Sequence, residues 1–168
     1  MRELSNIEKK SIEAQIPIGS IHLDGNLDIP EGARGIVVFV HGSGSSRFSP
    51  RNQSVARELQ KDGLGTLLFD LLTPEEERID MVTAHLRFDI DLLASRLVEV
   101  TNWLLKKQDI ENISVGYFGA STGAAAALIA AKERSDVVKA VVSRGGRPDL
   151  AEKALSDVKA PTLLIVGG

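Results

Sequence analysis

The residues with the clearest chemical potential are the segment 119–123, Gly-Ala-Ser-Thr-Gly. An apolar run, 114–118, comes directly before it, and an alanine-rich run, 124–131, comes directly after it. In a tight strand-to-helix turn the central residue takes a strained backbone conformation, so only very small residues fit two positions away on each side. Such a turn presents a serine hydroxyl at the carboxyl edge of a sheet, with a helix N-terminus behind it. The sequence therefore predicts Ser121 as a catalytic nucleophile.

A serine nucleophile also needs backbone donors that stabilise the oxyanion formed when it attacks a carbonyl carbon. The N–H of Thr122, the residue after the serine, is expected to be one donor. The second is expected from the segment 41–44, His-Gly-Ser-Gly, which follows an earlier strand. We favour the amide of Ser43, with Gly42 and Gly44 as alternatives. A turn that binds nothing, or one that cradles a phosphate, is the other interpretation, but the ending of a P-loop and the spacing of a dinucleotide fingerprint are absent.

The general base is harder to assign, because His22, His41 and His85 all precede Ser121. The usual order on this type of sheet is serine, acid, histidine. We expect His41 to fix the loop 41–44 by hydrogen bonding and His22 to be structural. His85 is expected at the start of a helix on the surface, with a role at the substrate site left open.

Two aspartates are candidates for the acid that orients such a base. Asp70 ends a predicted strand and could approach the cleft, whereas Asp149 is expected at the start of a helix. No histidine follows Asp149, and the one that follows Asp70, His85, comes before Ser121. Recruitment of His85 and Asp70 within the chain, or residues beyond Gly168, therefore remain alternatives.

Four arginines are predicted on loops at the carboxyl edge of the sheet, where open α/β folds bind ligands. They are Arg47, Arg51, Arg144 and Arg147. Arg47 and Arg144 are candidates for holding a substrate carboxylate through paired hydrogen bonds. The alternative is that these arginines are solvated and pair with aspartate and glutamate.

Composition limits the class of protein. The chain has 168 residues, a net charge of −3 and scattered lysine and arginine, which argues against nucleic acid as a partner. It has no cysteine, which excludes disulfides and a thiolate zinc site, and we expect neither a metal nor another cofactor. The polar start, Met1–Lys10, predicts no secretory signal. No apolar run approaches the ~20 residues that cross a bilayer. The expectation is a cytoplasmic protein that does not bind membranes.

Strand-like and helix-like patterns alternate along the chain. The predicted strands are 12–18, 20–27, 35–40, 64–71, 113–118, 137–143 and 161–166, with turn formers over 28–35. The predicted helices are 52–62, one starting at Thr73 and Pro74, Ala84–Lys107, 122–131 and 148–158. Continuous apolar strands that alternate with helices predict an α/β fold with a mostly parallel sheet, an antiparallel N-terminal edge and helices on both faces.

Five stretches of the chain resemble the dienelactone hydrolase family of α/β-hydrolases, particularly its small bacterial cytosolic members. They are His41–Arg47, Phe69–Thr73, His85–Asp89, Gly116–Gly123 and Ser143–Asp149. The resemblance implies a three-layer sandwich, Ser121 as nucleophile and an oxyanion hole formed by the Ser43 and Thr122 amides. In the family the acid follows the Gly-Gly after the last strand seen here, and the histidine comes one strand later. The resemblance thus implies a single domain, 1–168, that is C-terminally incomplete and lacks the last strand and helix.

The expected function is that of a serine hydrolase that acts on small carboxylic esters through an acyl-enzyme. Members of the family often use cysteine as the nucleophile, so serine at position 121 shifts the expectation towards general esters. Activity of the 168-residue form is expected to be weak or absent. The alternative is a non-catalytic scaffold or interaction domain whose sheet is completed by a partner chain or a second copy, which makes a homo-oligomer possible.

Overall fold

One sheet runs through the computed structural model, which describes residues 9–107, 110 and 112–167. Within these residues its strand order is β1-β2-β4-β3-β5-β6-β7. The strands are β1 (Lys9–Ile18), β2 (Ile21–Pro30), β3 (Gly35–Val40), β4 (Gly65–Phe69), β5 (Ser114–Ala120), β6 (Val138–Arg144) and β7 (Thr162–Ile165). β1 and β2 pair antiparallel, β2 pairs antiparallel with β4, and the remaining pairs are parallel. The predicted fold class is confirmed.

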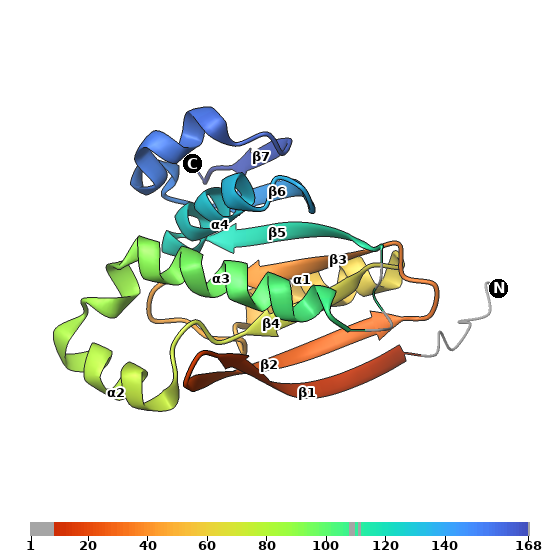
Figure 1. Ribbon diagram of the computed structural model, residues 1–168, viewed down its shortest axis with the longest axis horizontal. Coiled ribbons are helices and arrows are strands. Elements are labelled where there is room, and N and C mark those ends of the chain that lie inside the picture. The colour runs from red at the N-terminus through yellow and green to blue at the C-terminus, as the bar shows by residue number, and fades with distance from the viewer. Residues whose placement is uncertain (1–8, 108–109, 111, 168) are drawn as a thin grey trace.

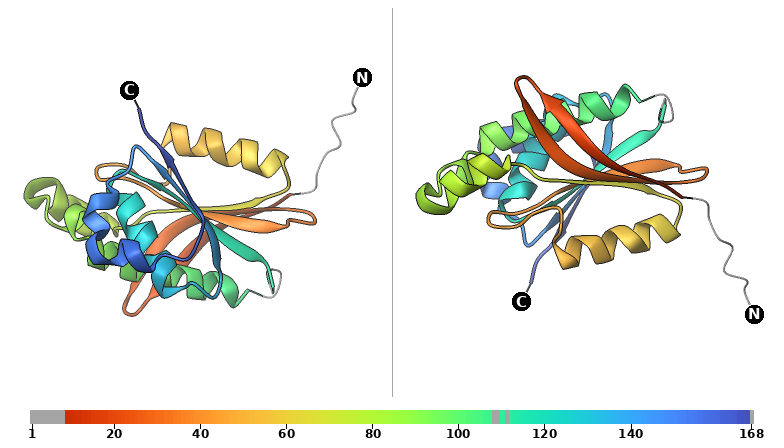
Figure 2. Two further views of the ribbon diagram at one scale, coloured as in Figure 1. Left: turned by 90° about the horizontal axis from the view of Figure 1, so that it is seen from above. Right: turned by 90° about the horizontal axis from the view of Figure 1, so that it is seen from below.

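Helices cover both faces of this sheet. The α-helices are α1 (Pro50–Lys61), α2 (Pro74–Thr83), α3 (Ile90–Leu105) and α4 (Thr122–Glu133), and the 3-10 helices are η1 (Leu86–Phe88) and η3 (Pro148–Asp157). Figure 2 shows α1 alone on one face, with α3 and α4 on the other. α2 and η1 extend beyond the ends of the strands (Figure 1). The result is a three-layer arrangement in which loops from several strands meet at one edge.

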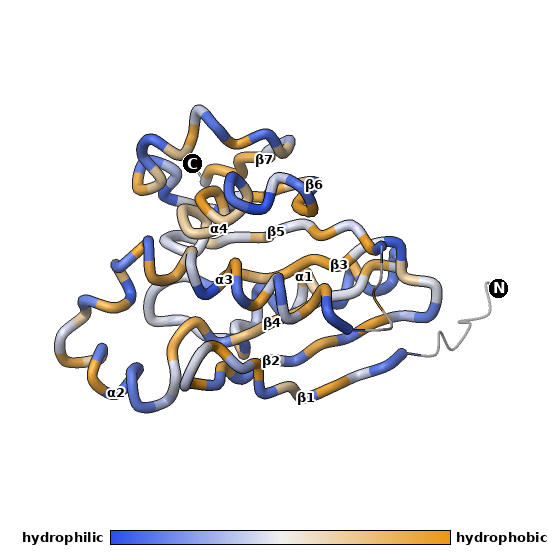
Figure 3. The backbone as a smooth tube through the Cα atoms, in the orientation of Figure 1, coloured by the Kyte–Doolittle hydropathy of each residue, from blue (hydrophilic) through white to orange (hydrophobic). Residues whose placement is uncertain are grey.

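The core is divided by the sheet into a large and a small cluster. The large one lies under α3 and α4 and is mostly aliphatic and alanine-rich. The small one, under α1, consists of Phe39, Ala56, Leu68 and Phe118, with the two phenylalanine rings 5.1 Å apart. Figure 3 shows the hydrophobic residues concentrated along β3 and β4. Burial of apolar surface on both faces of the central strands fixes the strand ends that build the site.

The predicted helix Ala84–Lys107 is wrong in its first turns. Ala84 has φ 56° and ends α2, and η1 follows before α3 begins at Ile90. The Asp89 side chain accepts a hydrogen bond from the N–H of Leu92 at 3.1 Å, which makes Asp89 the N-cap of α3. The apolar repeat continues across this boundary, so periodicity alone could not locate it.

Two further boundaries differ from the prediction. β2 continues through Pro30, so Asp28 lies in a strand and not in a turn. The predicted helix 148–158 is a 3-10 helix interrupted at Glu152, where φ is 44°. Pairing with β1 over its whole length explains the longer β2.

β7 forms one end of the sheet in the described part of the chain. It pairs with β6, and Leu163, Leu164 and Ile165 are exposed. Gly168, after which the family's acid and histidine are expected, lies outside the described residues, as does most of the polar start Met1–Lys10. Of the helices described, none is long and apolar enough to cross a membrane.

Candidate active site

The corner between β5 and α4 holds Ser121 in a strained conformation. Ser121 has φ 52° and ψ −125°, a left-handed region that costs a residue with a side chain about 1–3 kcal/mol. A Cβ on Gly123 would lie 2.2 Å from the carbonyl oxygen of Val40, and one on Gly119 would lie 2.5 Å from Cα of Ala124. Both glycines are therefore required by close backbone contacts. The turn expected from the sequence is present, and Ser121 is partly accessible.

The loop after β3 packs directly against this corner. A Cβ on Gly42 would lie 3.0 Å from Cβ of Ser121. The N–H of Ser43 donates a hydrogen bond to Oγ1 of Thr122 at 3.1 Å. The N–H of Thr122 belongs to the first turn of α4, where helix amides have no intrahelical acceptor. The structure thus brings Ser121, Ser43 and Thr122 together from segments that are about eighty positions apart.

His41 fixes the same loop, as expected from the sequence. Its Nδ1 donates to the carbonyl oxygen of Gly42 at 2.8 Å, and its Nε2 accepts from the N–H of Leu71 at 3.0 Å. Because Nε2 is an acceptor, the ring is the neutral tautomer with its proton on Nδ1. Burial lowers the pKa of His41. With both nitrogens engaged, His41 has no free nitrogen to take a proton from Ser121.

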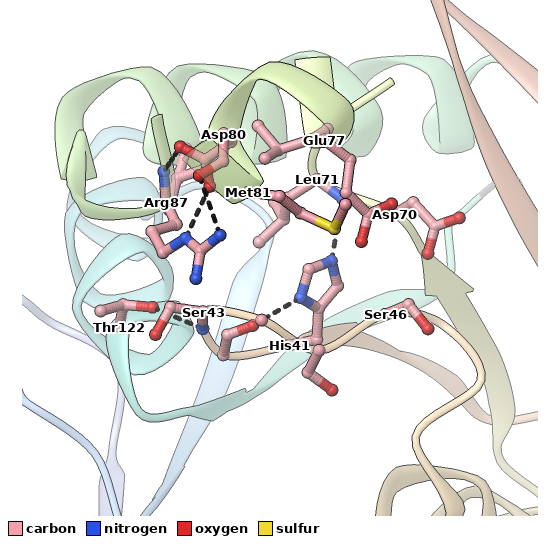
Figure 4. Close-up of a pocket in the computed structure, with 15 residues that line it drawn as sticks. His41, Ser43, Ser46, Asp70, Leu71, Glu77, Asp80, Met81, Arg87 and Thr122 are labelled. Atoms are coloured by element: carbon pink, nitrogen blue, oxygen red, sulfur yellow. Dashed lines mark hydrogen bonds and ion pairs between the residues drawn. The ribbon is translucent and has the colours of Figure 1, made fainter. Parts of the chain in front are cut away.

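A pocket of about 210 Å³ opens beside the corner (Figure 4). The loop 41–46 and Thr122 form one side, and Asp70, Leu71 and Leu72 after β4 form another. The far wall consists of Glu77, Asp80 and Met81 on α2, Arg87 on η1 and Leu93 on α3. Ser121 itself is not among the lining residues, but its neighbours Gly42 and Thr122 are.

An ion pair fastens the far wall. Nε of Arg87 lies 2.6 Å from Oδ2 of Asp80, whose side chain is almost fully buried. Oδ1 of Asp80 accepts from the N–H of Leu86 at 2.7 Å and from that of Arg87 at 3.2 Å. Burial by itself would raise the pKa of Asp80, but the hydrogen bonds from Arg87 and Leu86 hold this pKa below its usual value.

The remaining edge of the Arg87 guanidinium faces the pocket. Nη2 donates to the carbonyl oxygen of Asp80 at 3.0 Å. Nη1 has no hydrogen bond to a residue in the described part of the chain, and it lies 3.9 Å from where a Cβ on Gly44 would be. Figure 4 shows the group between α2 and the loop that carries Ser43. The sequence offered one signal for Arg87, its place in the 85–89 stretch, and none for Asp80.

The structure does not place Arg47 or Arg144 at the pocket. Arg47 forms an ion pair with Asp70, its Nε donates to Oδ1 of Asn26 at 3.0 Å, and its guanidinium stacks over Phe48. Arg47 therefore pairs with an acidic residue, which is the alternative to holding a substrate carboxylate. The same is true of Arg147, whose Nη2 lies 2.7 Å from Oδ2 of Asp149.

The other two arginines lie on the α1 side. Nη2 of Arg144 donates to Oδ1 of buried Asn52 at 2.9 Å, and its guanidinium carbon lies 5.7 Å from the centre of the Phe118 ring. Arg51 is exposed in the first turn of α1. Neither lines the pocket beside Ser121.

The candidate partners of the serine are also separated. His85 is exposed, and its Nδ1 lies 2.8 Å from Oγ1 of Thr83. Asp70 lines the pocket but pairs with Arg47, and Asp149 pairs with Arg147 as noted. His22 is exposed on β2. His85 and Asp70 thus do not form an acid–base pair with Ser121.

No family model matches the chain, but a solved structure identifies its relatives. A dienelactone hydrolase from Anabaena variabilis is 64% identical, with a TM-score of 0.92, over 95% of this chain and 74% of that chain. The chain belongs to the dienelactone hydrolase family. A Pyrococcus furiosus esterase has 19% identity and a TM-score of 0.68, over 94% of this chain and 69% of that chain. At that identity the esterase supports the shared α/β-hydrolase fold alone.

Curated relatives carry a different name. Two Mycobacterium tuberculosis proteins are 60% identical over 156 residues, and their names assign them provisionally to the phosphoribosyl transferases. The match covers 93% of this chain and 34% of each relative, so this dienelactone hydrolase family member spans about a third of their length.

Proposed function

We propose that the protein is a serine hydrolase that cleaves carboxylic esters through an acyl-enzyme on Ser121. The observation that carries the proposal is the strained backbone of Ser121, at φ 52° and ψ −125°, between two glycines that tolerate no side chain. A strained serine in this context is typical of a nucleophile elbow. The esterase and dienelactone hydrolase names of the structural neighbours agree with this chemistry.

In the proposed reaction Oγ of Ser121 attacks the carbonyl carbon of the ester. Its proton passes to a base, and the N–H groups of Ser43 and Thr122 stabilise the oxyanion. Collapse of the tetrahedral intermediate expels the alcohol and leaves an acyl group on Ser121, which water then removes. The pocket next to Thr122 and Gly42 would hold the substrate.

The base is assigned by the family pattern, which places the acid and the histidine after the Gly-Gly at 167–168. The histidines of the described residues support this assignment, because His41 has both nitrogens engaged and His85 is on the surface. A serine without its histidine keeps only residual reactivity from the oxyanion hole and binding. We therefore expect residues 1–168 alone to react slowly, and a chain that also carries the family's acid and histidine to react faster.

A fluorophosphonate probe tests the nucleophile. The protein with the family's acid and histidine in place should form a covalent adduct on Ser121, located by peptide mass spectrometry, and Ser121→Ala should abolish it. An unlabelled wild-type protein, or labelling that survives in Ser121→Ala, would refute the proposal.

A second candidate, a non-catalytic scaffold, is favoured by the exposed side chains of β7. Leu163, Leu164 and Ile165 form an apolar end of the sheet that a partner or a second copy could cover. Sedimentation of the protein separates the two functions. An active monomer disfavours the scaffold, and an obligate dimer without esterase activity supports it. We do not extend the phosphoribosyl transferase name of the two Mycobacterium tuberculosis relatives to this chain. The matched third of each relative corresponds here to a hydrolase fold.

A further inference from the structure

The peptide between Gly42 and Ser43 is held from both sides in the free protein. Its carbonyl oxygen accepts from Nδ1 of His41 at 2.8 Å and from the N–H of Ser45 at 3.1 Å. Its N–H donates to Oγ1 of Thr122 at 3.1 Å. The two bonds to the carbonyl oxygen already fix the direction of the peptide plane, so the bond to Thr122 is not needed to aim the N–H at the Ser121 corner.

The Thr122 hydroxyl occupies the N–H of Ser43 as its hydrogen-bond acceptor. The N–H that should receive the substrate oxygen already has an acceptor at hydrogen-bonding distance, supplied by the residue next to the nucleophile. We propose that the Thr122 hydroxyl is a built-in placeholder for the substrate carbonyl oxygen, which must displace it from the Ser43 N–H before reaction. This inference rests on the proposed function, because it concerns the same oxyanion site.

Displacement requires only a side-chain rotation. Oγ1 of Thr122 can leave the Ser43 N–H by moving to another staggered χ1 position, while the α4 backbone stays in place. Thr122 is only 3% exposed, but it lines the pocket, and the pocket side is where the rotated hydroxyl would go. A hydroxyl attached to the protein competes more effectively than water, because it loses little freedom when it binds the donor. The free protein therefore binds esters more weakly than it would with an unoccupied donor.

The placeholder makes a specific kinetic prediction for Thr122→Ala. Water replaces the hydroxyl and is displaced more readily, so kcat/KM for a p-nitrophenyl ester and the rate of fluorophosphonate labelling should rise about three- to tenfold, the range expected for one net hydrogen bond. The gain should come from a lower KM with little change in kcat, since the hydroxyl has already left in the bound complex. Thr122→Ser restores the hydroxyl and should return KM towards the wild-type value.

Thr162→Ala is the matched control, an exposed threonine on β7 whose removal should alter neither KM nor kcat. A Thr122→Ala protein with wild-type or higher KM, or with a lower labelling rate despite normal folding by circular dichroism, would overturn the placeholder. A lower kcat at unchanged KM would also overturn it, because it would show that the hydroxyl helps only the transition state.

Amide hydrogen exchange keeps the inference testable if the proposed function fails. If the wild-type protein is not labelled at all, the nucleophile assignment is lost, yet the Ser43 amide still reports the bond to Thr122. Faster exchange of this amide in Thr122→Ala, with Ser45 unchanged, supports occupation of the donor. Equal exchange in both proteins refutes it.

Discussion

The Ser121 corner (residues 119–123) and the pocket wall (residues 77–87) face the same cavity but are held by different means. The corner is fixed by backbone contacts that exclude a Cβ at Gly119 and Gly123. The wall extends beyond the sheet, exposes Ile79, Met81 and Val82, and is fastened largely by the side chains of Asp80 and Arg87. The comparison teaches that the corner depends on main-chain geometry, whereas the pocket wall depends on side-chain bonds, among them the ion pair of Asp80 with Arg87.

The largest expected effect is at the corner. Gly123→Ala places a Cβ 2.2 Å from the carbonyl oxygen of Val40, a backbone atom that cannot move without shifting β3. The free energy of unfolding, measured with urea, should fall by about 3 kcal/mol or more. Gly116→Ala on β5 is the matched control, because its Cβ would meet the carbonyl oxygen of Ala140 at an ordinary 3.5 Å. Similar losses in both variants would contradict the special role of the corner.

The wall should respond more weakly. Asp80→Asn removes the charge that pairs with Arg87, but Arg87 is partly exposed and keeps access to water. We expect the free energy of unfolding to fall by about 1–2 kcal/mol. Glu75→Gln, which breaks the exposed pair with Arg78, is the control and should change it by less than about 0.5 kcal/mol. If the two variants are equally stable, the ion pair does not fasten the wall.

The same contrast explains what the sequence could predict. The corner can be predicted from the sequence because the glycine spacing, the preceding strand and the following helix are all local to Ser121. The wall cannot, because the apolar repeat of α3 continues past Asp89, and Asp80 bonds residues six and seven positions away. The loop position of Arg47 favours it as an anion ligand, yet the fold pairs it with Asp70, and Arg87 faces the pocket instead.

Arg87 provides a test of what the wall selects. Arg87→Ala should loosen the wall for both kinds of ester, because it removes the partner of buried Asp80. Beyond that shared change it should raise KM for anionic esters about tenfold, the value of one charge-assisted interaction. Arg144→Ala is the comparison, since Arg144 is bonded to Asn52 and does not line the pocket. It should affect both kinds of ester alike. A selective effect of Arg144→Ala with none from Arg87→Ala would restore the expectation drawn from the sequence.

The smallest expected effect is a pH dependence of the free energy of unfolding. It arises at His41, which bonds both Gly42 in the loop beside the corner and Leu71 after β4. Burial lowers the pKa of His41 in the folded protein, so the unfolded chain takes up this proton first as the pH falls. Stability should be level above the unfolded pKa of about 6.5 and decline below it by less than about 1.4 kcal/mol per pH unit. Glu76 and Asp80, whose pKa values are also lowered, act only in more acidic solution, where the carboxylates protonate.

Urea unfolding at pH 7.5, 6.5 and 5.5 measures the decline, and His41→Gln should flatten it while His85→Gln, on the surface, should not. An equal decline in His41→Gln would show that another group takes up the proton.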